Sequence, residues 1–196
     1  MSVRHQLPPS CAVAFKEWSG VCAALEAGRQ IIILRKGGIA EGPGGFQPEH
    51  EVFWLYPTHV HEAQQGLREA FPDRGPARPD VVSLSALARV IFVERLPRRE
   101  ILERIEPFHI WTAETVARRF EYRTPGLWLL AVRVFRRDEP WPVAVTPEQA
   151  GCKTWVMLEQ ALPTEGLRPV GEDAEFARQL EALRKALADA EEVTTA

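Results

Sequence analysis

The feature that most restricts the fold of this chain is a glycine-rich segment between two short apolar runs. Residues 37–50, GGIAEGPGGFQPEH, hold five glycines and two prolines. This composition disfavours both helix and strand, so it predicts a shaped loop. The flanking runs, RQIIILRK at 29–36 and EVFWLYPT at 51–58, are dense in β-branched and aromatic residues and predict strands. Without a ligand, the simplest interpretation is a wide hairpin between these strands, with glycines at positions of positive φ.

The rest of the chain predicts an α+β protein: a mixed, mainly antiparallel sheet with flanking helices and a long C-terminal helix. Helical periodicity is found over 12–27, where Phe15, Trp18, Cys22 and Leu25 recur, and Gly28 predicts the helix end. Further helices are expected over 59–71, 97–108, 112–123 and 171–192, the third opened by the capping sequence TAET. The last carries an apolar stripe of Phe176, Leu180, Leu183 and Leu187. Strands are expected over 81–96, 127–137 and 141–147, and residues 153–162 are compatible with either structure.

Interleaved strands and helices without strict alternation argue against a doubly wound parallel sheet. The proline-rich stretch FPDRGPARPD at 71–80 is the best candidate boundary. We therefore expect an N-terminal lobe over 1–72, which carries the glycine-rich loop, and a C-terminal lobe over 80–196, packed together as one compact unit.

Composition excludes several classes of protein. No apolar run is long enough to span a bilayer, and the first residues lack the apolar stretch of a signal peptide, so we expect a cytoplasmic protein. The three cysteines have no C-x-x-C spacing, which argues against a zinc ribbon or a disulfide framework. The net charge is −3, but residues 93–137 carry 10 Arg against 6 Glu and residues 159–192 carry 9 acids against 4 bases.

The glycine-rich loop and its neighbours form a candidate anion site. Arg35 and Lys36 stand beside Gly37 and Gly38, and bare backbone N–H groups around Gly45 favour a nest that binds an anion. Lys16, on the first predicted helix, is a further candidate if that helix lies near the loop, although a solvated face is the simpler interpretation for Lys16 and Glu17. Neither phosphate-loop consensus is matched, so a purely structural turn remains the alternative.

The second candidate constellation is rich in histidine and glutamate. Glu49, His50 and His61 are the candidate catalytic residues, since imidazole and carboxylate groups perform acid-base chemistry near neutral pH. The strand at 51–56 would separate His50 from His61 by about 17–20 Å, so no shared metal site is predicted. His109 lies in the apolar run FHIW and is expected in the core or an interface. Six arginines are candidates to line one basic face: Arg118, Arg119, Arg123, Arg133, Arg136 and Arg137.

Several of these strings together resemble a known family. FKEW at 15–18, IILRKGGIAEGPGGF at 32–46, EH at 49–50 and FWLYPTHVHE at 53–62 resemble the bacterial family named domain of unknown function 1802. HIW at 109–111 and LWLLAVRVF at 127–135 extend the resemblance, which covers most of 11–160. The family is uncharacterised, but some relatives are fused to a restriction-endonuclease-like domain, which implies a nucleic-acid or defence setting. Its motif positions fall here on Lys16, Glu17, Arg35, Lys36, Gly37, Gly38, Glu41, Gly45, Glu49, His50, Tyr56 and His61.

Three functions fit the sequence. The first, favoured by the fusion context, is a nucleic-acid-associated module linked to restriction or defence, with phosphate bound by the glycine-rich loop and arginines of 93–137 extending the contact. The second is an enzyme acting on an anionic small molecule or phosphodiester through His and Glu acid-base chemistry. The third is a protein-interaction or scaffold domain, compatible with a homodimer. The sequence identifies no cofactor and indicates no membrane partner.

Overall fold

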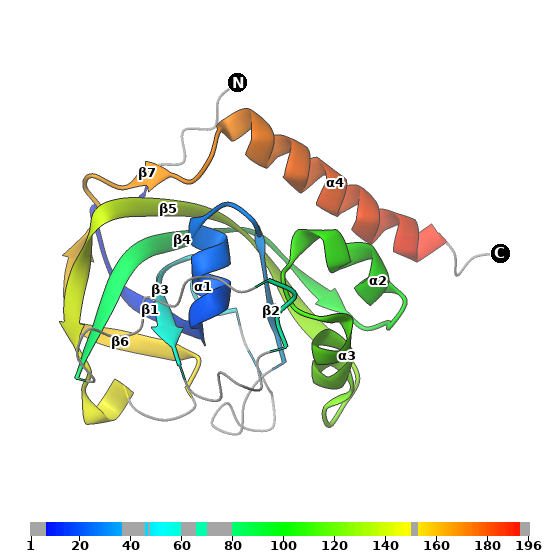
Figure 1. Ribbon diagram of the computed structural model, residues 1–196, viewed down its shortest axis with the longest axis horizontal. Helices are drawn as coiled ribbons and strands as arrows, with labels where there is room; N and C mark the ends of the chain where they lie inside the picture. Colours follow the sequence, from blue (N-terminus) through cyan, green and yellow to red (C-terminus); the bar gives the residue numbers. More distant parts are fainter. Residues whose placement is uncertain are drawn as a thin grey trace.

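The longest strands of the chain form the centre of its sheet. In the computed structural model, which describes residues 7–36, 46, 48–59, 66–69, 80–149 and 153–192, β4 (Val81–Leu96) and β5 (Leu127–Ala144) pair antiparallel over nearly their whole length (Figure 1). Register shifts at 84–86 and 90–92 mark bulges, which bend a strand and increase its twist. The two strands predicted at 127–137 and 141–147 are therefore one, because the charged residues between them continue the extended strand as an exposed arm.

The sheet confirms the predicted fold class. Its order is β2-β5-β4-β3-β1-β6, with β1 at Ser10–Trp18, β2 at Ile32–Arg35, β3 at Val52–Thr58 and β6 at Trp155–Pro163. A short β7 (Arg168–Pro169) pairs with β5. Among the described strands, β1 and β3 form the only parallel pair.

The predicted hairpin between strands at 30–36 and 51–56 is wrong. β2 pairs with β5, where Leu34 faces Leu129, whereas β3 lies between β1 and β4. β2 and β3 are thus three places apart in the sheet order and do not form a hairpin.

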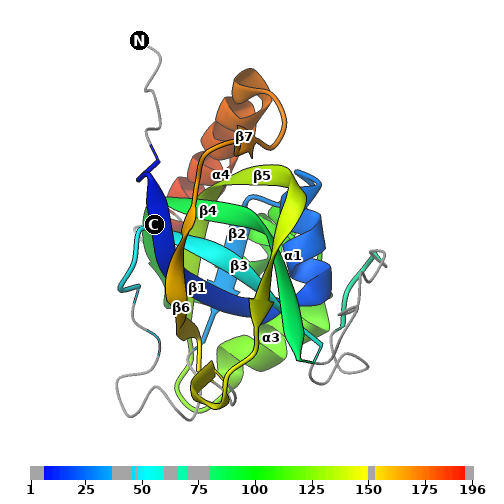
Figure 2. The ribbon, with the colours of Figure 1, turned by 90° about the vertical axis from the view of Figure 1, so that its left-hand side faces the viewer.

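The two edge strands of the sheet approach each other. β2 and β6 stand at opposite ends of the strand order, yet the Arg35 guanidinium donates a hydrogen bond from Nη2 to Thr154 Oγ1, immediately before β6. The sheet therefore curls into an open barrel, which Figure 2 shows from one end. Phe15 lies inside the curl, with its ring 4.8 Å from that of Trp155 and 4.9 Å from that of Phe53.

The first helix begins later than its periodicity predicts. Residues 10–18 form β1, and α1 occupies only Ser19–Glu26, so the helix predicted over 12–27 is wrong in its first half. Spacing of apolar residues favoured a helix, but β1 gains backbone hydrogen bonds on both edges, from β3 and from β6, and this tertiary pairing overrides a weak local preference. The predicted end is confirmed, since Gly28 has a φ of 69° and follows the last turn.

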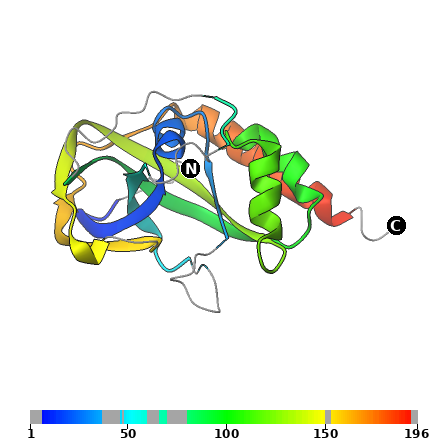
Figure 3. The ribbon, with the colours of Figure 1, turned by 60° about the horizontal axis from the view of Figure 1, so that its bottom comes forward.

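The remaining helices gather at one end of the sheet. α2 (Ile101–Ile105) continues into a 3₁₀ turn (Glu106–Phe108), and α3 (Ala113–Glu121) is capped by Thr112, whose Oγ1 accepts from the Thr115 N–H at 3.3 Å. α2 contacts both α3 and α4 (Asp173–Glu192), as Figure 3 shows. The helix predicted over 59–71 is not formed at 66–69, where Leu67 makes a β-bridge with Trp111.

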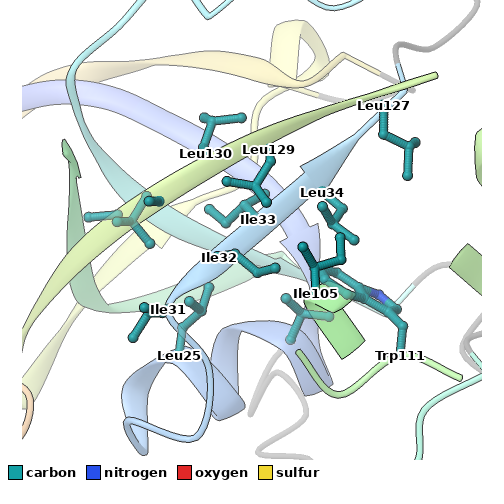
Figure 4. Close-up of a cluster of buried hydrophobic side chains, with 14 of the residues drawn as sticks. Leu25, Ile31, Ile32, Ile33, Leu34, Ile105, Trp111, Leu127, Leu129 and Leu130 are labelled. Atoms are coloured by element: carbon teal, nitrogen blue, oxygen red, sulfur yellow. The ribbon is translucent and has the colours of Figure 1, made fainter. Parts of the chain in front are cut away.

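The continuous apolar runs build the main core. Residues 31–34 of the β2 region pack with Leu129 and Leu130 of β5, and Ile105 and Trp111 close the cluster from the helical end (Figure 4). Phe176 and Leu183 on the predicted stripe of α4 belong to the same core. A buried arginine fixes the start of α4, since Arg133 Nη2 donates to Asp173 Oδ1 at 2.9 Å and to Gly171 O at 3.1 Å.

His109 lies in the core, as its apolar surroundings predicted. Its side chain is buried, its ring lies 5.4 Å from that of Trp111, and within the described part of the chain neither ring nitrogen has a hydrogen-bond partner. Burial, and then the nearby Arg68 charge, lower the pKa of His109 to about 4. The imidazole is consequently neutral at pH 7 in the folded protein.

Stability is expected to fall in mild acid because of His109. Its pKa is about 4 in the folded chain and about 6.5 when unfolded, so the unfolded state binds the extra proton as the pH drops from 6.5 towards 4. This difference removes about 2 kcal/mol between pH 7 and pH 5. Urea unfolding at both pH values checks it: His109→Leu should lose clearly less stability than the native chain over this interval. An equal loss in both proteins would show that His109 does not titrate in this way.

Candidate functional site

Cationic side chains concentrate at the end of the sheet next to α3. Here β2 and β4 end and β5 begins, close to the last turn of α3 (Figure 1). Glu17 and Trp18, near the end of β1, reach this region through their contacts with Arg35 and Arg119. We call this region the basic end and define it by its cations and its aromatic neighbours. Its cations are Arg35, Lys36, Arg95, Arg118, Arg119 and Arg123, and its aromatic residues are Trp18, Tyr122 and Trp128.

A row of three side chains crosses the basic end. Arg35 on β2 pairs in register with Trp128 on β5, and Trp128 pairs in turn with Arg95 on β4. Residues directly opposite each other on neighbouring strands project from the same face, so the three side chains share one face. The Arg95 guanidinium carbon lies 5.6 Å from the Trp128 ring centroid, within the range of a cation–π interaction. Arg95 is exposed and Trp128 partly so, whereas only 20% of the Arg35 side chain is exposed.

A buried carboxylate lies beside the row. The side chain of Glu17, near the end of β1, has no exposed surface, and its Oε1 accepts a hydrogen bond from the Trp18 N–H at 2.8 Å. Its Oε2 lies 3.7 Å from Arg35 Nη1 but accepts no hydrogen bond. Burying a carboxylate is costly unless it is paired, so the neighbouring arginines compensate for the burial of Glu17.

Arg119 supplies the second positive charge near Glu17. Its guanidinium carbon lies 4.0 Å from the Trp18 ring centroid and 5.4 Å from that of Trp111. Burial lowers the pKa of Arg119 to about 10, with the Glu17 charge opposing this shift and the charges of Arg35 and Arg118 adding to it. Arg119 therefore remains charged at pH 7, although much of its solvent has been replaced by aromatic rings.

Lys36 performs a structural task at the C-terminal end of α3. Its ammonium donates to Phe120 O at 2.6 Å, to Gly126 O at 2.8 Å and to Thr124 O. Three carbonyl acceptors use all three ammonium protons. Burial, and then the nearby Arg95, lower the pKa of Lys36. Lys36 was predicted to bind an anion beside Arg35, but in the structure its ammonium instead bonds three carbonyls at and after the end of α3.

Lys16 does not share a surface with Arg35. Side chains alternate along β1, and Lys16 projects to the face that carries Tyr56, whose ring centroid lies 5.6 Å from Lys16 Nζ. The ammonium also donates to Gln149 O in the 3₁₀ turn Pro147–Gln149. Of the predicted anion-binding side chains Lys16, Arg35 and Lys36, only Arg35 therefore lies in the row of the basic end.

Of the three predicted catalytic residues, Glu49 and His50 lie within the described part of the chain. His50 lies edge-on to Trp155, with ring centroids 4.9 Å apart, and Glu49 is exposed. His50 and Arg35 approach the same aromatic cluster, because Phe15 contacts Trp155 and also lies 5.0 Å below the Arg35 guanidinium carbon. Within the described residues no hydrogen bond or ion pair joins Glu49 or His50 to Arg35. Gly37, Gly38, Gly45 and His61 lie outside the described residues.

The six arginines considered as one basic face separate into two groups. Arg118, Arg119 and Arg123 belong to the basic end, whereas Arg133 is buried against α4, Arg136 faces Asp138, and Arg137 stacks 4.0 Å over Trp141. The idea of a single face is therefore wrong, because β5 is so long that its far half lies away from α3. Sequence reasoning did not single out Arg95 or Trp128, which strand register brings together, or Tyr122, which follows the last residue of α3.

The groups for a metal centre are not assembled in what the structure describes. Across residues 7–36, 46, 48–59, 66–69, 80–149 and 153–192, no group of three or more His, Cys, Asp or Glu side chains is placed to hold a metal ion. The chemistry offered by the basic end is instead that of fixed positive charge beside aromatic surface.

The chain belongs to the family described as Domain of unknown function (DUF1802), whose model matches residues 14–182. No curated protein matches the sequence. Among solved structures, the chain is similar to ASCH from Zymomonas mobilis at a TM-score of 0.44 and 13% identity, covering 87% of this chain and 94% of that one. A tyrosine-to-phenylalanine mutant of that protein is similar at a TM-score of 0.45 and 11% identity, covering 76% of this chain and 90% of the mutant. A serine-to-alanine mutant is similar at a TM-score of 0.41 and 13% identity, covering 90% of this chain and 99% of the mutant.

Removing the Glu17 charge is expected to destabilise the fold. Glu17→Gln keeps the size of the side chain but leaves Arg35 and Arg119 without their shared counter-charge. Breaking a fully buried pair costs about 3–5 kcal/mol, and the 20% exposure of Arg35 and the long 3.7 Å separation reduce our expectation to about 2 kcal/mol. Equilibrium urea unfolding at pH 7 measures the change.

The matched control is Glu175→Gln on α4. Glu175 also pairs with an arginine, Arg178, but both side chains are well exposed. An exposed pair contributes at most about 1 kcal/mol, so this variant should stay close to the native chain. Equal stability of Glu17→Gln and the native protein would contradict the role assigned to Glu17.

Proposed function

We propose that this protein is a nucleic-acid-binding module that holds the phosphate backbone at its basic end. The observation that carries the proposal is the row Arg35–Trp128–Arg95, in which strand register places an aromatic residue between two arginines and the Arg95 guanidinium lies over the aromatic ring. Arginine matches the geometry of phosphate oxygens, and aromatic rings stack on bases, so this combination suits a nucleic acid. The family description states no function, and the proposal rests on the side chains alone.

The spread of the cations favours a polyanion over a small anion. Arg35 and Arg95 lie two strand spacings apart, which corresponds to about 10 Å between their backbones. Arg118 and Arg123 extend the positive surface along the end of α3, and both are exposed. A small anion is bound by cations that converge on one point, whereas a phosphate backbone makes contacts along its length.

Arg95 is held ready for such a contact. Its guanidinium lies against Trp128, and Nη2 donates to Pro125 O at 3.5 Å. Gly126 permits this arrangement, since a Cβ at that position would lie 2.5 Å from Arg95 Nη1 and the φ of Gly126 is +124°. A side chain that is fixed before binding loses less conformational entropy when it contacts its ligand.

Glu17 acts here as a positioning residue. Its carboxylate neutralises part of the charge of Arg35 and Arg119 and thereby allows two guanidinium groups to stay near each other at the edge of the core. The more exposed Arg95, Arg118 and Arg123 are left to provide attraction. This local positive surface is necessary because the whole chain carries a net charge of −3 and would otherwise repel a polyanion.

The phosphate-binding groups proposed here differ from those predicted around the glycine-rich loop. Phosphate binding is assigned to Arg35 together with Arg95, and Lys36 shapes the neighbouring turn, while any contribution of Gly37, Gly38 and Gly45 stays a prediction from the sequence. The link to restriction or defence likewise stays a prediction from the family resemblance.

Arg95→Ala is expected to weaken nucleic-acid binding and to change its salt dependence. Losing one phosphate contact should lower the slope of log K against log salt by about 0.7 for single strands or 0.9 for duplexes. Fluorescence anisotropy with labelled single-stranded and duplex oligonucleotides, over a series of KCl concentrations, measures both affinity and slope.

Arg168→Ala provides the comparison. Arg168 on β7 is an arginine with 70% of its side chain exposed and pairs with Asp138, far from α3 (Figure 1). This variant should keep the native affinity and slope. If the native protein binds neither probe at low salt, or if both variants behave alike, phosphate is not held at the basic end.

A further inference from the structure

We infer that the turn after α3 presents Tyr122 as a stacking surface for one unpaired base, so that the partner is single-stranded nucleic acid. The inference rests on the proposed function, because it names the form of nucleic acid that the basic end accepts. It is carried by the conformation of residues 121–126, by the side chain that fixes them and by the exposure of the Tyr122 ring.

The turn has an unusual backbone. Arg123 has a φ of 60°, and it is the one non-glycine residue with a positive φ in the described part of the chain. An L-residue in this region costs about 1–2 kcal/mol, and arginine has no local side-chain bond that would favour it. The turn closes where the Gly126 N–H donates to Phe120 O at 3.0 Å. Surrounding contacts must therefore impose the conformation.

Lys36 supplies those contacts. Its ammonium gathers the carbonyls of Phe120, Thr124 and Gly126 around a single charge at the C-terminal end of α3. A cation at this position also opposes the negative end of the helix dipole. The arrangement uses the charge of a partly buried lysine to fix the turn between α3 and β5.

The result of this shape is an exposed aromatic ring. Tyr122 is 48% exposed and lies just after the last residue of α3. The Arg123 guanidinium carbon lies 5.2 Å from the Tyr122 ring centroid, which places a positive charge against the ring. Aromatic side chains are usually buried, so a tyrosine held at the surface beside a cation offers the two groups that bind a nucleotide, one for the base and one for the phosphate.

The turn also borders the row of the basic end. Pro125 O accepts a hydrogen bond from Arg95, and Gly126 packs against the Arg95 guanidinium. A strand whose base stacks on Tyr122 therefore has two phosphate-binding groups at the same turn, Arg123 against the ring and Arg95 bonded to Pro125. Paired bases in a duplex are stacked on their neighbours and expose no face to a single ring, so this arrangement selects an unpaired strand.

The test compares substitutions of Tyr122 on three labelled probes: a single-stranded oligonucleotide, the same strand with an abasic backbone, and a duplex. Both DNA and RNA versions are used, because the ring stacks on a base with either sugar. We expect Tyr122→Ala to weaken single-strand binding by roughly five- to a hundredfold, the range for loss of one stacked base. Tyr122→Phe keeps the ring and should bind like the native protein. Neither variant should change binding of the abasic strand or the duplex.

A second variant tests the turn itself. Lys36→Met removes the ammonium and should release the strained turn, with a single-strand loss similar to that of Tyr122→Ala and a lower thermal midpoint. Since Tyr122 is half exposed, Tyr122→Ala should retain the native thermal midpoint, which separates lost stacking from lost folding.

The outcomes separate the two proposals. If the native protein binds the probes but Tyr122→Ala binds the single strand as well as the native chain does, the stacking inference is overturned while the proposed function stands. An equal loss on the abasic strand would also overturn it, because no base is present there to stack. If the native protein binds none of the probes at low salt, both proposals are overturned.

Discussion

The buried charge of Glu17 determines how one end of this molecule is built. A carboxylate without exposed surface requires positive partners, and the nearest are Arg35 at the end of β2 and Arg119 at the end of α3. These come from an edge strand and a helix that are far apart in the sequence. The electrostatic demand of one side chain thus ties together the β2 edge, the start of α1 and the helical end.

The same interaction helps to close the sheet. Arg35 faces Glu17 with one nitrogen and donates to Thr154, just before β6, with the other. Because β2 and β6 are the two edges of the strand order, a single guanidinium spans the gap between them. The bulges in β4 and β5 provide the bend, and Arg35 fixes the edges at one point, which also limits the exposure of unpaired strand edges.

Arginine and lysine do different work in this region. Arg35, Arg95 and Arg119 each lie over an aromatic ring, as the flat guanidinium permits. Lys36 is a compact charge with three donors and is surrounded by three carbonyls. An exchange of lysine for arginine at position 36 would not preserve the turn after α3, because a planar fork cannot direct its protons at three converging oxygens. The strong bias of the composition towards arginine is consistent with aromatic stacking at several sites.

The sequence by itself determined most of the elements and the class of the fold. Residues 32–35, 52–58 and 81–96 are strands because β-branched and aromatic residues dominate them, and the TAET cap and the stripe Phe176–Leu183 predicted two helices correctly. These signals are local, so they can be read from neighbouring residues. The helix predicted over 12–27 was wrong in its first half, because the apolar spacing there fits both the helical and the strand period. Only pairing with β3 and β6 decides for a strand.

Which residues come together at the basic end was decided by the tertiary structure. The sequence identified Arg35 and the cationic segment 93–137, but it grouped Arg35 with Lys36 and Lys16 because they are close along the chain or share a motif. Register across β2, β5 and β4 instead unites Arg35 with Trp128 and Arg95, while alternation along β1 turns Lys16 away. Strand pairing joins residues separated by tens of positions, and no local pattern records which strands will be neighbours.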